Sequence, residues 1–496
     1  MAVIPRHILS KSTFVKGCQC EKALYLSKFH RGLRQETSEQ QQAIFDQGTS
    51  IGELAQKLFP GGVDASPETP YEYQKSVVKT QQLIMAGHKI IYEAAFQFDG
   101  VLCAMDILVW KNKKWYAFEV KGTTSVKEQF ILDAALQYYV ITNSGTPLAD
   151  ISIIHLNNQY IRKGELNIKE LFATESVLEN IKEQQDFVAE KIESLKLMLK
   201  QKKIPDVKIG AQCFSPYECD FINHCWKDLP EKNSVFTLGR IGGKAFELID
   251  SGIFHLDDIP DDYPLSPSSA FQLEYYKSGK KFIEKEEIRN FLEPFTYPLH
   301  FFDFETYMSG VPDFDISRPY QQIPFQYSLH VIGKGKTEEQ HFEFLGDGIN
   351  DPRESLILQM INDLGSNGSV IAYNKSFEQS RIKELARDFP EYAEQLLEIN
   401  ERMVDLATPF QKRWYYHPAF EGQYSIKVVL PVLVPKLSYE SLEIQEGGTA
   451  SLVYSQLKHQ EEEIKIQHRK QLLEYCKMDT LAMVKILEYL NNLTNL

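Results

Sequence analysis

The sequence contains no long apolar run, and no stretch of it approaches the roughly 18 consecutive hydrophobic residues that a membrane span needs. We therefore expect no transmembrane helix and no membrane partner. The opening residues, MAVIPRHILSKSTFVKG, also lack the apolar core of a secretory signal peptide. These features predict a cytoplasmic protein.

Basic residues are in deficit as well. Lys and Arg together number 54 against 68 Asp and Glu, which leaves a formal net charge of -14. This balance argues against a protein that holds nucleic acid by bulk electrostatic attraction. It does not exclude a metal-dependent nuclease, because the acidic ligands of such an enzyme are counted in the deficit and local basic patches can still contact phosphates.

Neither an internal repeat nor a low-complexity tract interrupts the chain. At 496 residues, with 43% hydrophobic and 25% charged residues, the composition is that of a globular protein with roughly two to four domains. We expect an α/β protein with domains at residues 1–228, 229–292 and 293–496.

Cysteine is scarce, yet three of the seven fall close together, at Cys213, Cys219 and Cys225. In a reducing compartment, clustered cysteines hold metal more often than they form disulfides. Three thiolates make an incomplete site, since zinc and cubane iron–sulfur clusters usually take four protein ligands. The fourth ligand must come from elsewhere. His224 is one candidate, although a surface histidine is the simpler interpretation.

Two carboxylates and a lysine lie on two predicted strands, at residues 101–110 and 115–122. Glu119 and Lys121 are two positions apart and so point to the same face, while Asp106 lies among apolar neighbours in the partner strand. Two carboxylates can hold a divalent ion that activates water, and a lysine can position that water or stabilise the developing charge. The alternative is a surface salt bridge between Glu119 and Lys121 beside an incidental aspartate.

Neighbouring segments extend this pattern. A predicted helix after the second strand carries Gln137, the segment before the first strand carries Glu93, and an earlier predicted helix carries Glu53. Near the N-terminus, Cys20 is followed by the basic residue Lys22 and then by Leu-Tyr-Leu. The set resembles the RecB-like branch of the PD-(D/E)XK nucleases, in particular the iron–sulfur members related to the CRISPR-adaptation nucleases.

This resemblance implies a restriction-endonuclease-like fold and a nuclease site for the first region. Asp106 and Glu119 would bind Mg²⁺ or Mn²⁺, and Lys121 and Gln137 would complete the catalytic set.

The same resemblance implies a [4Fe–4S] cluster. In the family one cysteine precedes the nuclease core and three follow it, and the family motif favours Cys20 over Cys18 as the early ligand. The cluster ligands would then be Cys20, Cys213, Cys219 and Cys225. A structural zinc is the alternative.

Two features depart from the family pattern. Many relatives have a histidine on the first core helix, where this sequence has Gly52 beside Glu53. The Gln-x-x-x-Tyr signature is shortened, because Gln137 is followed directly by Tyr138 and Tyr139. Either departure is consistent with weak or absent activity at this site.

Residues 229–292 are predicted to form a small helical linker. A short apolar segment, a turn at Gly242-Gly243 and a helix beginning near Lys244 resemble a helix-hairpin-helix element. Such a turn offers backbone N–H groups and a helix N-terminus to a phosphate without reading the base. Arg240 and Lys244 would add positive charge. A plain helical linker explains the segment equally well.

A second set of acids lies toward the C-terminus. Asp303 and Glu305 interrupt a hydrophobic predicted strand on one face, and an apolar strand rarely buries two acids unless a cation neutralises them. Glu378 falls at the start of a predicted helix, and Tyr475 and Asp479 lie one turn apart on another. The predicted order of three strands, helix, strand and helix resembles that of RNase H-like folds.

These elements resemble the tyrosine-containing DEDD exonucleases, which degrade nucleic acid from the 3′ end. The resemblance implies that Asp303 and Glu305 form the first acidic pair, that Glu378 and Asp479 supply the other two acids, and that together they bind Mg²⁺ or Mn²⁺. Tyr475 would orient the attacking water. Glu378 is a departure, since the family usually has Asp there. The segments DFETYMSGVPDFDISRPYQQ, SYESL and YCKMDTLAM also resemble the domain of unknown function 2779, a bacterial family.

Further candidates have a structural alternative of equal or greater weight. Asp405 is a reserve metal ligand, although a turn or capping role explains it more simply. Candidate contacts to a nucleic-acid backbone, with packing against the sheet as the alternative, are Arg318, Tyr320, Gln321, Ser425 and Lys427.

The sequence therefore predicts a nuclease with a RecB-like site and a 3′→5′ exonuclease site, acting on nucleic acid, DNA in the first place, in repair, processing or phage defence. One alternative is a nucleic-acid-binding protein in which one or both sites are inactive. The other is a scaffold whose acid clusters are only structural, which two separate sets of acids at matching places make less attractive.

Overall fold

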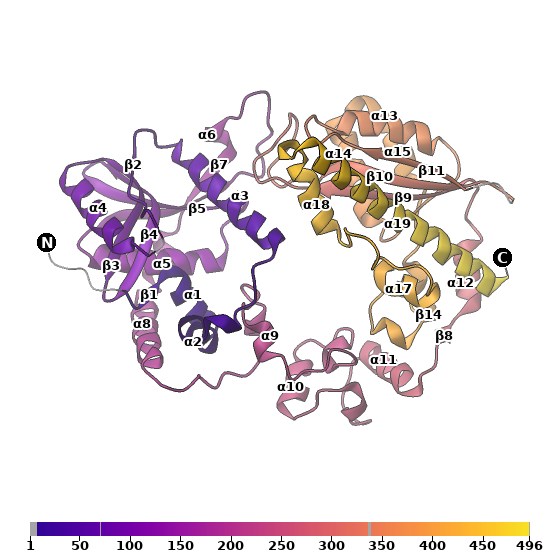
Figure 1. Cartoon of the computed structure of the whole chain (residues 1–496), viewed down its shortest axis with the longest axis horizontal. Helices are drawn as coiled ribbons and strands as arrows, with labels where there is room; N and C mark the ends of the chain where they lie inside the picture. Colours follow the sequence, from indigo (N-terminus) through magenta and orange to yellow (C-terminus); the bar gives the residue numbers. More distant parts are fainter. Residues whose placement is uncertain (1–6, 70, 336–338, 496) are drawn as a thin grey trace. The chain divides into compact units, whose positions relative to one another are not determined.

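The computed structural model describes residues 7–69, 71–335 and 339–495. The chain divides into two compact units, each of mixed α/β architecture (Figure 1). The first comprises residues 1–228 with 309–320, and the second comprises 229–308 with 321–496. None of the helices in the described ranges is both long and apolar enough to span a membrane.

A seven-stranded sheet organises the first unit. Its strands follow the order β2-β3-β4-β5-β6-β7, and β1 pairs with β4 outside this path. Strands β3, β4 and β5 are antiparallel neighbours, whereas β5 and β6 are parallel. The bounds are β1 Leu9–Ser10, β2 Val63–Asp64, β3 Ile90–Phe98, β4 Val101–Lys111, β5 Lys114–Lys121, β6 Leu148–Leu156 and β7 Phe172–Ser176.

Helices pack around this sheet in two hydrophobic clusters. In one, Phe130 of α5 and Ile192 of α8 pack with inward residues of the central strands. In the other, Ile51 of α3 packs against Ile107 and Ile154. The helices are α1 Lys11–Gln19, α2 Glu21–Phe29, α3 Glu39–Gln56, α4 Tyr73–Met85, α5 Glu128–Asn143, α6 Ile168–Leu171, α7 Leu178–Lys182, α8 Gln185–Leu199 and α9 Ile222–Cys225.

The second unit begins with short helices around a small core of its own. Val235, Leu248 and Leu273 belong to this core. The helices are α10 Lys244–Asp250, α11 Pro267–Ser278 and α12 Lys285–Leu292, and α10 begins where the sequence predicts it. A two-stranded antiparallel sheet, β8 Phe282–Ile283 with β14 Tyr415–Tyr416, ties this segment to the rest of the unit.

A five-stranded sheet of order β11-β10-β9-β12-β13 forms the centre of the second unit. Strands β9 to β11 are antiparallel, and β12 and β13 continue the sheet parallel to β9. The bounds are β9 Leu299–Tyr307, β10 Ile323–Ile332, β11 Gln340–Leu345, β12 Ser369–Ala372 and β13 Met403–Asp405. The predicted sequence of three strands, helix, strand and helix is thus observed in the chain.

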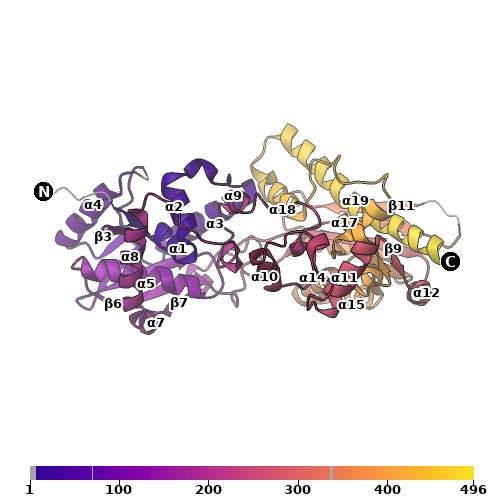
Figure 2. The same cartoon turned by 90° about the horizontal axis from the view of Figure 1, so that it is seen from below.

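Alternation along β9 decides what each side of this sheet carries. Phe302 and Phe304 pack into a core with α13, α14 and α15. Asp303 and Glu305 belong to the opposite face, where α18 and α19 contact β9. Figure 2 shows α19 as one continuous helix. The helices are α13 Arg353–Leu364, α14 Ser376–Asp388, α15 Ala393–Glu401, α16 Thr408–Gln411, α17 Ile426–Leu433, α18 Gly447–Gln456 and α19 Glu462–Thr494.

Candidate metal centres

The second unit holds a possible metal-binding triad. One ligand atom each of Asp303, Glu305 and Cys476 lies within 4.8 Å of the other two. In the described parts of the chain this is the one set of three such side chains that converges so closely. Asp303 and Glu305 come from β9, and Cys476 comes from α19, which crosses that face of the sheet.

Two more of the predicted acids face the triad. The charges of Asp479 and Glu378 add to burial in raising the pKa of Asp303 well above its ordinary value. The pKa of Glu305 is raised in the same way, mainly by burial and by Asp479, although Lys427 opposes the shift. Carboxylates in this arrangement repel one another unless a proton or a metal ion intervenes. The charges of Glu378 and Asp479 therefore act on the acidic pair of β9.

Glu378 has a buried carboxylate oxygen without a hydrogen-bond donor. It lies in the first turn of α14, and only 2% of its surface is exposed. Its Oε2 atom has no hydrogen-bond partner. Burial, followed by repulsion from Asp405, raises the pKa of Glu378 to about 8. A buried carboxylate oxygen without a donor is costly, and a cation would remove that cost.

Tyrosines and a lysine surround Asp479. The Tyr439 hydroxyl donates a hydrogen bond of 2.6 Å to Oδ1 of Asp479. The Tyr475 hydroxyl lies 3.2 Å from Nζ of Lys427, and this Nζ is also 5.2 Å from the Tyr475 ring centroid. Burial raises the pKa of Asp479 to about 6, although the bond from Tyr439 and the charge of Lys427 oppose the shift. The charge of Lys427 thus lowers the pKa of both Glu305 and Asp479.

The remaining candidates of this region lie in different settings. Asp405 is the last residue of β13, and its side chain accepts hydrogen bonds from the backbone N–H groups of Asn374 and Ala407. Asp405 therefore stabilises the turns around it, as the simpler interpretation expects. The Tyr320 hydroxyl donates to the carbonyl of Gly122 within the first unit, and its ring packs in the cluster around Ile51. The side chain of Gln321 donates a hydrogen bond to Asp388, and Arg318 is partly buried. Ser425 is the residue before α17, and its side chain makes no capping hydrogen bond.

The predicted site of the first unit centres on Glu119, which is 2% exposed. Its Oε1 lies 2.5 Å from Nζ of Lys11 and 3.0 Å from Nζ of Lys121, and its Oε2 accepts a 2.6 Å hydrogen bond from Gln137. Burial would raise the pKa of Glu119, but the two lysines outweigh it and bring the pKa to about 2. Lys121 also reaches Oδ2 of Asp133 at 2.5 Å.

Asp106 and Glu93 lie where the alternation of two strands breaks. In β3, Ile91 and Ala94 are three positions apart yet face the same core. In β4, Met105 and Leu108 have the same spacing and face this core too. Regular alternation would place the members of each pair on opposite faces, so each strand breaks its alternation between the two residues. Glu93 adopts a φ of 52°, in the left-handed region that is rare for a residue of this kind. The kink places Glu93 opposite Asp106 in the register of the two strands.

Burial and the charge of Glu119 raise the pKa of Asp106 to about 8, while its Oδ2 accepts a 2.6 Å bond from the Val120 N–H. Burial and Glu119 also raise the pKa of Glu93. Both acids, with Glu119, line an open pocket whose other wall includes Glu53 of α3. This centre differs from the first because lysines already neutralise Glu119.

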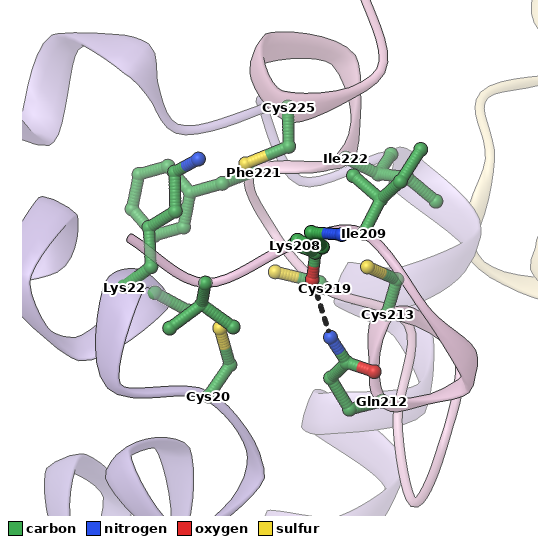
Figure 3. A pocket seen from close by; sticks show the side chains of 12 residues that line it. Cys20, Lys22, Lys208, Ile209, Gln212, Cys213, Cys219, Phe221, Ile222 and Cys225 are labelled. Carbon is green, nitrogen blue, oxygen red and sulfur yellow. Dashed lines mark hydrogen bonds between the residues drawn. The ribbon is translucent and has the colours of Figure 1, made fainter. Parts of the chain in front are cut away.

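The four predicted cysteines line one pocket. Figure 3 shows the side chains of Cys20, Cys213, Cys219 and Cys225 directed toward it from the start of α2 and from the segment around α9. Burial, together with the neighbouring thiols, raises the pKa of Cys219. Cys18 instead packs against the main core of the unit.

The sulfur spacing is informative about the kind of metal. Thiolates that share a tetrahedral zinc lie about 3.8 Å apart, since each Zn–S bond is about 2.3 Å. Among the described residues no three of these sulfurs lie within 4.8 Å of one another. The four thiols are therefore spread more widely than the ligands of one bound zinc ion.

Several residues of these centres carry no recognisable pattern in the sequence. Lys11 and Asp133 were not among the expected site residues, and neither were Tyr439 and Cys476. Lys11 lies 108 positions before Glu119, so no local pattern connects them. Tyr439 belongs to SYESL, a stretch noted only for its family resemblance, and Cys476 is the residue directly after Tyr475.

Comparison with known sequences agrees with one of the resemblances. The family described as domain of unknown function (DUF2779) matches residues 300–425. The matched segment contains Asp303, Glu305 and Glu378, and it ends before Tyr475 and Asp479.

The chain is also similar to three curated mycoplasmal proteins. It is 31% identical over 206 residues to "Uncharacterized protein MG366 homolog" of Mycoplasma pneumoniae, which covers 38% of this chain and 31% of the relative. It is 27% identical over 249 residues to "Uncharacterized protein MG366" of Mycoplasma genitalium, and this match covers 45% of this chain and 36% of the relative. It is 31% identical over 220 residues to "Uncharacterized protein UU173" of Ureaplasma parvum, and this match covers 39% of this chain and 31% of the relative. The matches thus span about a third of the length of these relatives.

Proposed function

We propose that the protein is a metal-dependent nuclease whose main active centre lies in the second unit and removes nucleotides from the 3′ end of a nucleic acid. One observation carries the proposal. Asp303 and Glu305 converge on one face of β9, the charges of Glu378 and Asp479 act on them in a largely buried site, and the cations that oppose this charge are Lys427 and Arg381. Such a site fits divalent cations better than it fits a structural role.

The donor set fits Mg²⁺ or Mn²⁺, which prefer carboxylate oxygens. When bound, these ions would activate water and stabilise charge on the scissile phosphate. Tyr475 lies one helical turn before Asp479, so its hydroxyl can orient a water beside the acids. Lys427 can hold that hydroxyl in place and face the phosphate, and Tyr439 fixes the rotamer of Asp479.

The strand order of the second unit supports the same proposal. Three antiparallel strands extended by two parallel ones, with the first acidic pair on the central strand, is the arrangement expected of an RNase H-like domain. Repair, processing or phage defence would be the setting, with DNA as the first substrate to test.

A second nuclease centre in the first unit is a further part of the proposal. Its support is the pocket lined by Glu93, Asp106 and Glu119, beside which Lys121 bridges Glu119 and Asp133. Gln137 orients Glu119, and Lys121 is placed to position water. A metal that engages Glu119 must displace Lys11 from Oε1, so we expect this centre to bind metal more weakly than the other.

Phenylalanine in place of Tyr475 tests the exonuclease assignment. We expect the Tyr475→Phe variant to bind Mn²⁺ nearly as the parent does, but to degrade a 5′-labelled oligonucleotide roughly 10- to 100-fold more slowly, because only the orientation of water is lost. The measurement is a ladder assay with Mg²⁺ or Mn²⁺ on DNA and RNA oligonucleotides whose 3′ ends are free or blocked.

Tyr489→Phe provides the matched control, since Tyr489 lies on the same helix and its hydroxyl contacts Tyr415 instead of the acids. Equal digestion of free and blocked 3′ ends would contradict an exonuclease. The absence of any metal-dependent degradation would reject the proposed function.

The cysteine cluster predicts a bound iron–sulfur group. We expect protein purified without oxygen to be brown, with iron and sulfide in about equal amounts, and the Cys213→Ser variant to lose both and to melt at a lower temperature. Cys18→Ser is the control. Cys18 packs against the main core of the unit and does not line the pocket, so this variant should keep its iron. Stoichiometric zinc without iron in the parent would contradict the assignment.

A further inference from the structure

A second recess of the second unit lies outside the acidic centre. This pocket, of about 720 Å³, is formed where the loop before α10 and the start of α11 meet α16, β14 and the loop after them. The residues that matter here are Arg240, Ser268, Phe271, Arg413, Tyr416 and Tyr424.

The charge of the pocket is opposite to that of the chain. Arg240 and Arg413 line it close enough that Arg240 acts with burial to lower the pKa of Arg413. No Asp or Glu is among the lining residues, although the chain has a formal net charge of -14 and Glu421 lies near enough to act on Tyr416. Two guanidinium groups that line one cavity with no carboxylate among the lining residues form a site for an anion.

The two arginines are held in different ways. Arg413 donates a hydrogen bond to Oγ of Ser268 and stacks over the ring of Phe271, with its guanidinium carbon 5.0 Å from the ring centroid. Arg240 is exposed, and it makes no hydrogen bond or ion pair with a described residue. Both have left-handed backbone conformations, with φ of 62° and 59°. Such conformations are uncommon for arginine and cluster at ligand sites.

An unpartnered polar group also lines this pocket. Tyr416 is 5% exposed, and its hydroxyl has no hydrogen-bond partner. A buried hydroxyl is rarely left without a partner, so a ligand oxygen or nitrogen is the natural candidate. Tyr424 lines the same pocket but is 43% exposed, which leaves part of its surface free for stacking.

The pocket is connected to the acidic centre by two hydrogen bonds. Gln411, which lines the pocket, donates to Oδ1 of Asn374 at 2.8 Å. The hydroxyl of Tyr373 donates to the carbonyl of Tyr424 at 2.6 Å. Tyr373 and Asn374 lie just before α14, whose first turn carries Glu378. The loop that contacts the pocket therefore leads directly into the helix that carries one of the acids.

We propose that this pocket binds one nucleotide unit of a single-stranded nucleic acid, on the 5′ side of the terminus held at the acidic centre. Arg240 and Arg413 would bind the phosphate, Tyr416 would bond to the nucleotide, and the base would stack on Tyr424. Arginine with aromatic faces is the combination that holds single strands without reading their sequence. The proposal rests on the proposed function, since it makes the pocket a subsite of the exonuclease.

Arg240 is the residue to change, because it is exposed and the folded chain does not depend on its contacts. In the full-length chain with the Asp303→Asn change, we expect Arg240→Glu to weaken binding of a fluorescent single-stranded oligonucleotide about tenfold, and Arg240→Gly about fivefold. The slope of log affinity against log salt should fall by about one. Arg240→Gly should melt no lower than the parent, because glycine tolerates this φ.

Lys232→Glu is the matched control, since it makes the same charge change in the same linker but does not line the pocket. DNA and RNA oligonucleotides form the two arms of the anisotropy titration, and a nucleoside monophosphate is the competitor. Equal losses in Arg240→Glu and Lys232→Glu would overturn the proposal. So would competition by the monophosphate at the concentration at which the oligonucleotide binds, which would make the pocket a site for free nucleotides.

Failure of the proposed function has a different signature. If the parent degrades no oligonucleotide with Mg²⁺ or Mn²⁺, the exonuclease assignment is rejected whatever the binding data show. If the parent degrades 3′ ends and the Arg240 variants bind and degrade like the parent, only the subsite is rejected.

Discussion

Replacing Asp303 with Asn is expected to reduce stepwise 3′→5′ degradation about a thousandfold, the equivalent of about 4 kcal/mol of transition-state stabilisation. Asp303 is at the centre of the site, because its oxygen lies within 4.8 Å of ligand atoms from Glu305 and Cys476, and the charges of Asp479 and Glu378 act on it. The amide keeps the shape of the side chain but removes the charge that a divalent cation requires. The rate is measured with the ladder assay at saturating Mn²⁺.

The same substitution should stabilise the protein when no metal is present. The pKa of Asp303 in the folded chain is raised well above its ordinary value by burial and by the neighbouring acids. Its neutral form therefore favours folding below about pH 4, and this contribution is lost as the pH rises toward the folded pKa. In EDTA, the melting temperature of Asp303→Asn should exceed that of the parent by a margin that grows from pH 5 to pH 8.

Mg²⁺ or Mn²⁺ should reverse the order of the two proteins at pH 8, because the parent gains binding energy that the variant lacks. Glu394→Gln is the matched control, since Glu394 is an exposed acid on α15 of the same unit. An Asp303→Asn variant that degrades 3′ ends like the parent would exclude this centre as the source of exonuclease activity. Equal melting temperatures in EDTA at pH 8 would contradict the electrostatic account of the site.

Changing Lys121 to Ala, or Asp106 to Asn, is expected to reduce the nuclease activity of the first unit at least about a hundredfold. The 3′→5′ activity of the second unit should persist. Lys121 contacts both Glu119 and Asp133, and Asp106 faces Glu119 and Glu93 in the pocket. Each change is made in the parent, where the 3′→5′ activity is followed, and in the Asp303→Asn background, where the activity of the first unit is isolated on single- and double-stranded substrates.

Glu175→Gln is the control for the first unit, because Glu175 is an exposed acid of the same sheet that contacts His155. If the Asp303→Asn background retains cleavage that neither Lys121→Ala nor Asp106→Asn reduces, the first centre is not its source. If that background retains no cleavage at all, the first centre is inactive, and the alternative of a nucleic-acid-binding domain with a decayed site is favoured for this unit.

Local patterns were sufficient for the elements and for the acids that lie on them. Asp303 and Glu305 stand out because acids at alternate positions in an apolar strand share a face, and the spacing of Tyr475 and Asp479 is one helical turn. The helix at Lys244 was also predicted, from the glycine-rich turn at Gly242-Gly243 directly before it. In each case the signal lies within a few residues, where the period of a strand or helix fixes the direction of the side chains.

Partners distant in sequence were decided by the tertiary structure alone. Lys11 meets Glu119 because β1 pairs with β4 and brings the start of α1 to the sheet, and no periodicity spans that separation. The kink at Glu93 depends on the register of two strands, and Tyr439 reaches Asp479 across loops that carry no pattern. The arginine pocket likewise joins Arg240 to Arg413 through the pairing of β8 with β14. The sequence by itself determined which residues carry charge and on which face of an element they lie, whereas packing between elements determined which charges meet and which are left for a ligand.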